Sequence, residues 1–130
     1  MKKASTIIIL DKNDHILLQH RDAGAPTHPN MWGLWGGELE AGESFAEAAI
    51  REIGEELGIR VQASDLSQFG RYLEEEGTKE VLVFVLRDTG AFTYVLGEGD
   101  GMQFFNREEL KDLPLVPTTR QATTDYYTTA

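Results

Sequence analysis

The order of apolar and polar residues predicts paired strands in the first third of the chain. Two runs of β-forming residues, Thr6–Leu10 and His15–Gln19, flank the turn-like segment Asp11–Asp14, which is the pattern of a β-hairpin. The next segment, Arg21–Asn30, contains two prolines, a glycine and an asparagine, so we expect a loop there. A short strand is expected to follow over Trp32–Trp35.

The clearest helix pattern covers Ser44–Gly58. Ser44 and Glu47 have the spacing of a capping box, and Gly58 stands where a C-terminal cap is expected. Apolar residues recur at helical spacing and form one stripe, made of Ala46, Ala49, Ile50, Ile53 and Leu57. The pattern therefore predicts an amphipathic helix with one buried face.

Further strands and two more helices are expected downstream. The segment Glu80–Leu86 is apolar on both faces, which is typical of a central strand. The other expected elements are strands over Gln68–Leu73, Phe92–Leu96 and Met102–Phe105, a loop over Gly97–Gly101, and helices over 106–113 and Pro117–Tyr127. Strands and helices interleaved in this way predict a single α/β domain over residues 1–130 with a mixed sheet.

Composition and charge restrict the class of protein. The chain has 130 residues, a net charge of −10 and no cysteine, so thiolate metal sites and thiol nucleophiles are excluded and a reducing cytoplasm is the expected location. The acidic balance argues against nucleic-acid binding, which requires a basic face. The apolar run Ala4–Leu10 ends at Asp11 and is too short for an export signal or a membrane span, so we expect no membrane partner.

Three acidic residues are concentrated on the expected helix. Glu52, Glu55 and Glu56 are spaced i, i+3 and i+4, so their side chains emerge as neighbours beside the apolar stripe. Neighbouring carboxylates repel one another, and a divalent cation among them relieves that repulsion. Oxygen ligands of this kind suit Mg²⁺ or Mn²⁺. A solvated acidic face is the alternative for any single glutamate, but the clustering next to a Gly-Gly turn favours a metal site.

The segment Gly37–Ile59 resembles the Nudix box. Its order is Gly, five residues, Glu, seven residues, Arg-Glu, an aliphatic residue, one residue, Glu-Glu, one residue, Gly and an aliphatic residue. The matching positions are Gly37, Glu43, Arg51, Glu52, Ile53, Glu55, Glu56, Gly58 and Ile59. The strand that ends at Arg21, the tryptophan before the Gly-Gly pair and the late Glu-Glu-Leu helix are similar to the superfamily as well.

The resemblance implies a fold, a reaction and a metal site. The fold is an α/β/α sandwich around a mixed sheet, and the reaction is hydrolysis of a nucleoside diphosphate linked to another group. The cofactor is Mg²⁺, with Mn²⁺ as a substitute. The implied metal ligands are Glu52, Glu55, Glu56 and the carbonyl group of Gly37.

The expected catalytic residues are Glu52, Glu55 and Glu98. In some members of the family the general base is the glutamate next to the arginine, here Glu52, and in others it is a glutamate on a later loop. Glu98 is our candidate for the later residue, either as base or as a further metal ligand, and Asp100 is its competitor.

Arg51 and Glu43 are usually structural in the family. The spacing of the helix allows Arg51 to pair with Glu47 and Glu55 at i−4 and i+4.

Two residues outside the box are expected to bind substrate. Arg21 ends a strand that carries a phosphate-contacting arginine in the family, and Trp35 replaces a proline that many members have before the Gly-Gly pair. We expect the indole of Trp35 to line the substrate pocket, with a capping role on the sheet as the alternative. Trp32 is also able to stack on a base, whereas Phe104 and Phe105 are expected in the core.

The expected substrate is a (d)NTP, oxidised or not, hydrolysed to a monophosphate and pyrophosphate. Signatures of other Nudix subfamilies are missing, since for example no proline lies between Ile59 and Pro114. One alternative is another pyrophosphate, such as a nucleotide sugar or prenyl diphosphate. The other is a Nudix-like ligand-binding or regulatory module without turnover, against which the complete set of box glutamates argues. Many family members are homodimers, but no apolar surface pattern here demands one.

Overall fold

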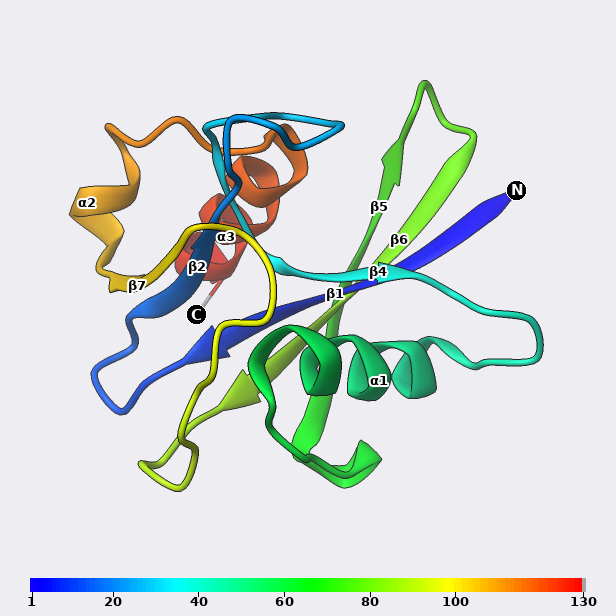
Figure 1. The fold of residues 1–130 in the computed structure, drawn as a ribbon, viewed down its shortest axis with the longest axis horizontal. Coiled ribbons are helices and arrows are strands. Elements are labelled where there is room, and N and C mark those ends of the chain that lie inside the picture. The colour runs from blue at the N-terminus through cyan, green and yellow to red at the C-terminus, as the bar shows by residue number, and fades with distance from the viewer. Residues whose placement is uncertain (130) are drawn as a thin grey trace.

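A mixed, seven-stranded sheet forms the middle of the molecule in the computed structural model, which describes residues 1–129 (Figure 1). The strands are β1 (Lys2–Leu10), β2 (Ile16–His20), β3 (Trp32–Gly33), β4 (Trp35–Glu38), β5 (Leu66–Glu74), β6 (Lys79–Arg87) and β7 (Gly101–Phe105). Strand β1 pairs in parallel with β6 and antiparallel with β2 and β4. Strand β5 extends the sheet beyond β6, and β3 and β7 both pair with β2.

Helices cover both faces of this sheet (Figure 1). They are α1 (Phe45–Leu57), α2 (Arg107–Leu110) and α3 (Pro117–Thr129), with a single 3₁₀ turn over Ala63–Asp65. Successive side chains of a strand point to opposite faces, so Ile7 and Ile9 of β1 join the core under α1 while Ile8 and Leu10 join the core under α3. The layers therefore follow the expected α/β/α order.

Most of the elements expected from the sequence are confirmed, and α1 is the clearest case. Ser44 Oγ accepts a hydrogen bond from the Glu47 backbone N–H at 3.1 Å, and the Ser44 N–H donates to Glu47 Oε1 at 2.8 Å, which is the predicted capping box. Gly58 ends the helix with φ of 67°, in the left-handed region that favours glycine. The hairpin, the central strands and the two late helices are also present at the expected positions.

The expected strand over Phe92–Leu96 is wrong. Side chains do alternate in this segment, since Phe92, Tyr94 and Leu96 pack against the core under α1. The backbone, however, bonds to the end of α1: Val95 N–H donates to Leu57 O at 2.9 Å. The last carbonyl groups of a helix have no partner within the helix, and here they bond to this segment in place of a neighbouring strand.

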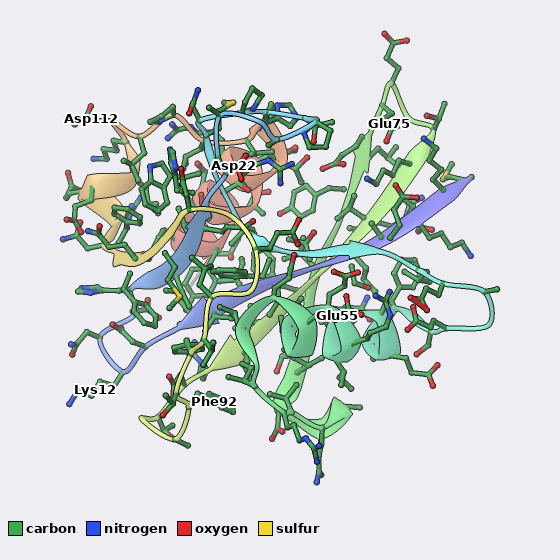
Figure 2. The ribbon with its side chains drawn as sticks, viewed as in Figure 1. Lys12, Asp22, Glu55, Glu75, Phe92 and Asp112 are labelled. Carbon is green, nitrogen blue, oxygen red and sulfur yellow. The ribbon has the colours of Figure 1, made fainter. Side chains whose placement is uncertain are left out.

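We call residues 88–100 the β6–β7 loop. It runs along the C-terminal end of α1, and Phe92 and Glu55 mark the loop and the helix in Figure 2. None of the helices within residues 1–129 has the length and apolar character that crossing a bilayer requires.

Candidate active site

The backbone of β4 lies against two carboxylates of α1. The Gly36 N–H donates a hydrogen bond to Glu56 Oε1 at 2.9 Å. A Cβ atom at Gly37 would lie only 2.6 Å from the carboxyl carbon of Glu52, so a side chain at this position would displace Glu52. The Gly-Gly pair thus allows two carboxylates to approach one short stretch of backbone, which includes the carbonyl group of Gly37.

Glu56 is the most buried of the acidic residues on α1, with only 6% of its surface exposed. Burial, together with the carboxylates of Glu52, Glu98 and Glu55, raises its pKa to about 8 against the opposing hydrogen bond from Gly36. The field at this position therefore favours the binding of positive charge.

Arg51 connects the loop before α1 to Glu52. Its guanidinium group donates to both carboxylate oxygens of Glu43, at 2.7 and 3.0 Å, to Glu52 Oε1 at 2.8 Å and to Glu38 O at 3.0 Å. The Arg51 hydrogen bond holds the pKa of Glu43 below its usual value. The bond to Oε1 orients the Glu52 carboxylate beside Gly37.

The expected helical partners of Arg51 are half correct. Glu55 Oε1 lies 3.5 Å from Arg51 Nη1, as the i+4 spacing predicts. Glu47 is not the second partner, because its carboxylate closes the capping box with Ser44.

The β6–β7 loop brings Glu98 to the C-terminal end of α1, near Glu55 and Glu56. Gly97 N–H donates to Glu56 O at 2.8 Å, and the buried Gln19 side chain donates to Glu98 O at 2.8 Å. A Cβ atom at Gly97 would lie 2.5 Å from Glu55 O, so the close approach of loop and helix requires glycine there. The Glu98 side chain is exposed beside this contact.

Asp100, the competitor of Glu98, is held elsewhere. Its carboxylate lies 2.5 Å from Nδ1 of His20, and its N–H donates to His20 O at 3.1 Å. This pairing leaves Glu98 as the better candidate of the two.

The donor set fits a hard divalent cation. It consists of carboxylate and carbonyl oxygens from α1, β4 and the β6–β7 loop, and such ligands suit Mg²⁺ or Mn²⁺ rather than a softer metal. Among residues 1–129, no three His, Asp or Glu side chains are already gathered into a metal cage. Glu55 in particular is 60% exposed and turned towards Arg51, so the carboxylates must move together to share an ion.

A cavity of about 830 Å³ opens beside the Gly-Gly pair, on the face of the sheet that carries α3. Gly36, Gly37, Arg21, Thr118 and Gln121 are among the residues that line it. A smaller cavity of about 200 Å³ is lined by Gln19, Arg21 and Glu98. Arg21 thus lies between the large cavity and the loop that carries Glu98.

The guanidinium group of Arg21 already has partners in its own loop. Arg21 Nε donates to Thr27 O at 2.8 Å and Nη2 donates to Thr27 Oγ1 at 3.0 Å. These bonds close the segment 21–27 next to the cavity and keep the expected substrate-binding arginine at its edge.

The substrate-lining role expected for Trp35 is wrong. Its side chain is 0% exposed and its indole N–H donates to Leu17 O at 3.0 Å, so the ring is part of the core under α1. Trp32 packs edge-on against His20 and Phe105, each at 4.9 Å between ring centroids. Among the described residues that line the large cavity there is no Phe, Tyr or Trp side chain, and the imidazole of His28 is the aromatic ring present.

Sequence reasoning missed the residues that hold the β6–β7 loop. Gln19 lay within an expected strand and gave no signal. Gly97 and Gly99 flank Glu98 in the sequence, and that Gly-Glu-Gly pattern was a sign of close backbone approach on both sides.

A model of the NUDIX domain matches residues 1–126 of the chain. The chain belongs to the Nudix family. Its fold agrees, since a solved MutT structure from work on the Aliivibrio salmonicida and Vibrio cholerae proteins superposes with a TM-score of 0.75 at 21% identity, over 95% of this chain and 98% of the other.

Two curated Nudix relatives give the range of similarity. A Bacillus subtilis protein named "Putative 8-oxo-dGTP diphosphatase" is 31% identical over 121 residues, which cover 92% of this chain and 76% of that protein. An m7GpppN-mRNA hydrolase of Xenopus laevis is 36% identical over 64 residues, 49% of this chain. The chain spans only 22% of the Xenopus protein and less than two thirds of several other curated relatives.

Replacing Gly37 by alanine is expected to reduce activity without unfolding the protein. The new Cβ would displace the Glu52 carboxylate, which lies 2.6 Å away and is the end of a flexible side chain. We expect kcat to fall by about one to two orders of magnitude, while the melting temperature changes little. Steady-state kinetics and thermal unfolding of the same preparation measure both quantities.

Gly54→Ala is the matched control. It also lies in the box, but a Cβ there meets nothing closer than Ile59 O at 3.7 Å. It should keep full activity and gain roughly 1 kcal/mol of stability, the helix preference of alanine over glycine. Wild-type activity in Gly37→Ala would show that the position of Glu52 beside β4 is not needed.

Proposed function

We propose that this chain is a pyrophosphohydrolase that cleaves a nucleoside diphosphate linked to another group. The favoured substrate is a (d)NTP, oxidised or not, and the products are a monophosphate and pyrophosphate. The observation that carries the proposal is the meeting of Glu52 and Glu56 with the loop of Glu98 beside the Gly-Gly pair, next to a cavity of about 830 Å³. The proposed unit is one domain over residues 1–130.

Four groups would hold the cation: the carboxylates of Glu52, Glu55 and Glu56 and the carbonyl group of Gly37. When bound, Mg²⁺ or Mn²⁺ neutralises charge on phosphate oxygens and makes water a better nucleophile. Arg51 keeps Glu52 in place through its 2.8 Å hydrogen bond. This arrangement holds a polyanionic substrate without the lysine that a phosphate-binding loop would use.

Glu98 is the proposed general base. One carboxylate oxygen of Glu52 accepts the hydrogen bond from Arg51, so a proton arriving there competes with the guanidinium group. Glu98 is exposed at the end of α1 and lines the small cavity together with Arg21. A water molecule between substrate and Glu98 would therefore have a carboxylate to receive its proton.

The relatives support a nucleotide substrate. The Bacillus subtilis relative is named for 8-oxo-dGTP and the Xenopus relative for the m7GpppN end of mRNA, and both compounds contain phosphoric anhydride bonds. We propose a small molecule rather than a nucleic acid as the partner of this chain, because its net charge is −10. A cytoplasmic location is proposed on the absence of cysteine.

One observation favours a second candidate, a nucleotide sugar or another pyrophosphate. The side chains that line the large cavity within residues 1–129 include no Phe, Tyr or Trp ring, and such rings are the usual platform for a base. A substrate whose organic half is held by hydrogen bonds would use this cavity as well as a nucleoside would.

Product analysis by chromatography tests the proposal. Purified protein is incubated with Mg²⁺ or Mn²⁺ and a panel of nucleoside triphosphates, oxidised triphosphates and nucleotide sugars. We expect the wild type to form pyrophosphate and a monophosphate from one triphosphate. The Glu55→Gln and Glu56→Gln variants should form neither product. Glu108→Gln, at a 75% exposed position on α2, serves as the control. Turnover of a nucleotide sugar alone would contradict the proposed (d)NTP substrate in favour of the second candidate. No turnover of any compound would contradict the proposal that the chain is an enzyme.

A further inference from the structure

The β6–β7 loop starts at Asp88, whose carboxylate accepts four hydrogen bonds from the loop itself. Asp88 Oδ1 accepts backbone N–H groups from Gly90 at 2.7 Å, Ala91 at 3.1 Å and Phe92 at 3.4 Å, while Oδ2 accepts the Tyr94 hydroxyl at 2.6 Å. Only 8% of the Asp88 surface is exposed. Burial alone would raise its pKa, but these hydrogen bonds hold the pKa below its usual value. The first residues of the loop are therefore held by the charged, buried carboxylate of Asp88, which we call the anchor.

Tyr94 extends this anchor to the core. Its ring packs against Phe92 and Phe104, with centroids 6.3 and 6.1 Å away, and belongs to the cluster under α1. A packed aromatic ring has few rotamers open to it. The hydroxyl on Asp88 and the ring in the core together determine where the next residues run.

The path from Tyr94 to Glu98 is fixed at almost every residue. Val95 N–H donates to Leu57 O at 2.9 Å, Gly97 N–H donates to Glu56 O at 2.8 Å, and Glu98 O accepts from Gln19. Little freedom remains between the anchor and the Glu98 side chain.

The end of the loop lies against the carboxylate-bearing helix. Gly97 N–H bonds to the Glu56 carbonyl group, and the exposed Glu98 follows directly. A loop without a firm attachment would be free to carry Glu98 away from α1. The attachment at Asp88 and Tyr94 opposes that movement.

We propose that Asp88 and Tyr94 are positioning residues, which hold Glu98 beside Glu56 for the hydrolytic step. The proposal rests on the proposed function for its link to catalysis. The role we assign to the Tyr94 hydroxyl is to fix the position of the Glu98 carboxylate, and not only to stabilise the fold in general.

Tyr94→Phe tests the proposal, because it removes only the hydroxyl. Tyr72→Phe is the matched control, since the Tyr72 hydroxyl also donates to an aspartate, Asp125 at 2.8 Å, from a ring that lies in the core under α3. We expect Tyr94→Phe to lower kcat about tenfold with KM changed less than about twofold. In a Glu98→Gln background the same substitution should have no further effect on kcat, because the two residues act as a unit.

Amide hydrogen exchange, measured by NMR without metal or substrate, gives a readout that does not depend on turnover. The Val95 and Gly97 amides should exchange faster in Tyr94→Phe and in Asp88→Asn than in the wild type or Tyr72→Phe. Unchanged exchange, or kcat losses that are additive with Glu98→Gln, would overturn the proposal. A wild-type protein that turns over no compound would refute the proposed function alone, and the exchange rates would still decide the anchoring.

Discussion

Glu56→Gln is expected to lower kcat by about three orders of magnitude and, in the absence of metal, to make the protein more stable. The activity falls because an amide cannot replace a carboxylate ligand of a divalent cation, and removing a group that stabilises transition-state charge has effects of about this size. The fold should persist, since the glutamine oxygen can still accept the hydrogen bond that Gly36 N–H gives to Glu56.

The gain in stability follows from the direction of the pKa shift. The folded-state pKa of Glu56 is raised from 4.5 to about 8, so ionisation opposes folding, and wild-type stability should fall as the pH rises from about 4.5 to about 8. In urea unfolding with a chelator, Glu56→Gln should be more stable than the wild type at pH 8 by roughly 4 kcal/mol, and similar to it at pH 4. A variant that is less stable at pH 8, or that retains kcat, would contradict this account.

Arg51→Ala is expected to have the largest destabilising effect, about 2 kcal/mol, together with a fall in kcat of about a hundredfold. The substitution removes the hydrogen bonds to Glu43, Glu52 and the Glu38 carbonyl at once. It leaves Glu43 and Glu52 without the guanidinium group that neutralises them, and Glu52 loses the partner that orients it. Urea unfolding and steady-state kinetics at one pH measure the two effects.

Two further variants make this test specific. Arg51→Lys keeps the charge but has a single ammonium group, which cannot reach the three acceptors together, so it should lie between the wild type and Arg51→Ala. Arg71→Ala removes an exposed guanidinium group that pairs with Glu80 on the sheet, and such surface pairs contribute roughly 0–1 kcal/mol. Equal losses in Arg51→Ala and Arg71→Ala would show that Arg51 has no special role.

Helix α1 could be predicted from the sequence because its signals are local. The capping box at Ser44, the glycine cap at Gly58 and the apolar stripe all act within a few residues of each other. The acidic cluster follows from the same periodicity, since Glu52 and Glu56 lie one turn apart. A short pattern was therefore enough to place both carboxylates on one side of the helix.

The parts that could not be predicted depend on contacts between distant segments. The sequence of Phe92–Leu96 gave an expected strand, but it could not show that the backbone partner of this segment is the end of a helix. Arg51 pairs with Glu43, which the turn before α1 brings close to it, and not with Glu47, the partner that helical spacing predicted. Trp35 was expected to line the substrate pocket but lies in the core, because a strand of only four residues, β4, gives almost no periodicity from which to predict burial.

Mn²⁺ binding to chelator-treated protein, followed by electron paramagnetic resonance of the free ion, tests the central claim most directly. The wild type and Glu108→Gln should bind Mn²⁺, and Mg²⁺ should compete for the same site. Glu56→Gln should lose most of this binding while remaining folded. Equal Mn²⁺ binding by Glu56→Gln and the wild type would contradict the assignment of the metal site to α1.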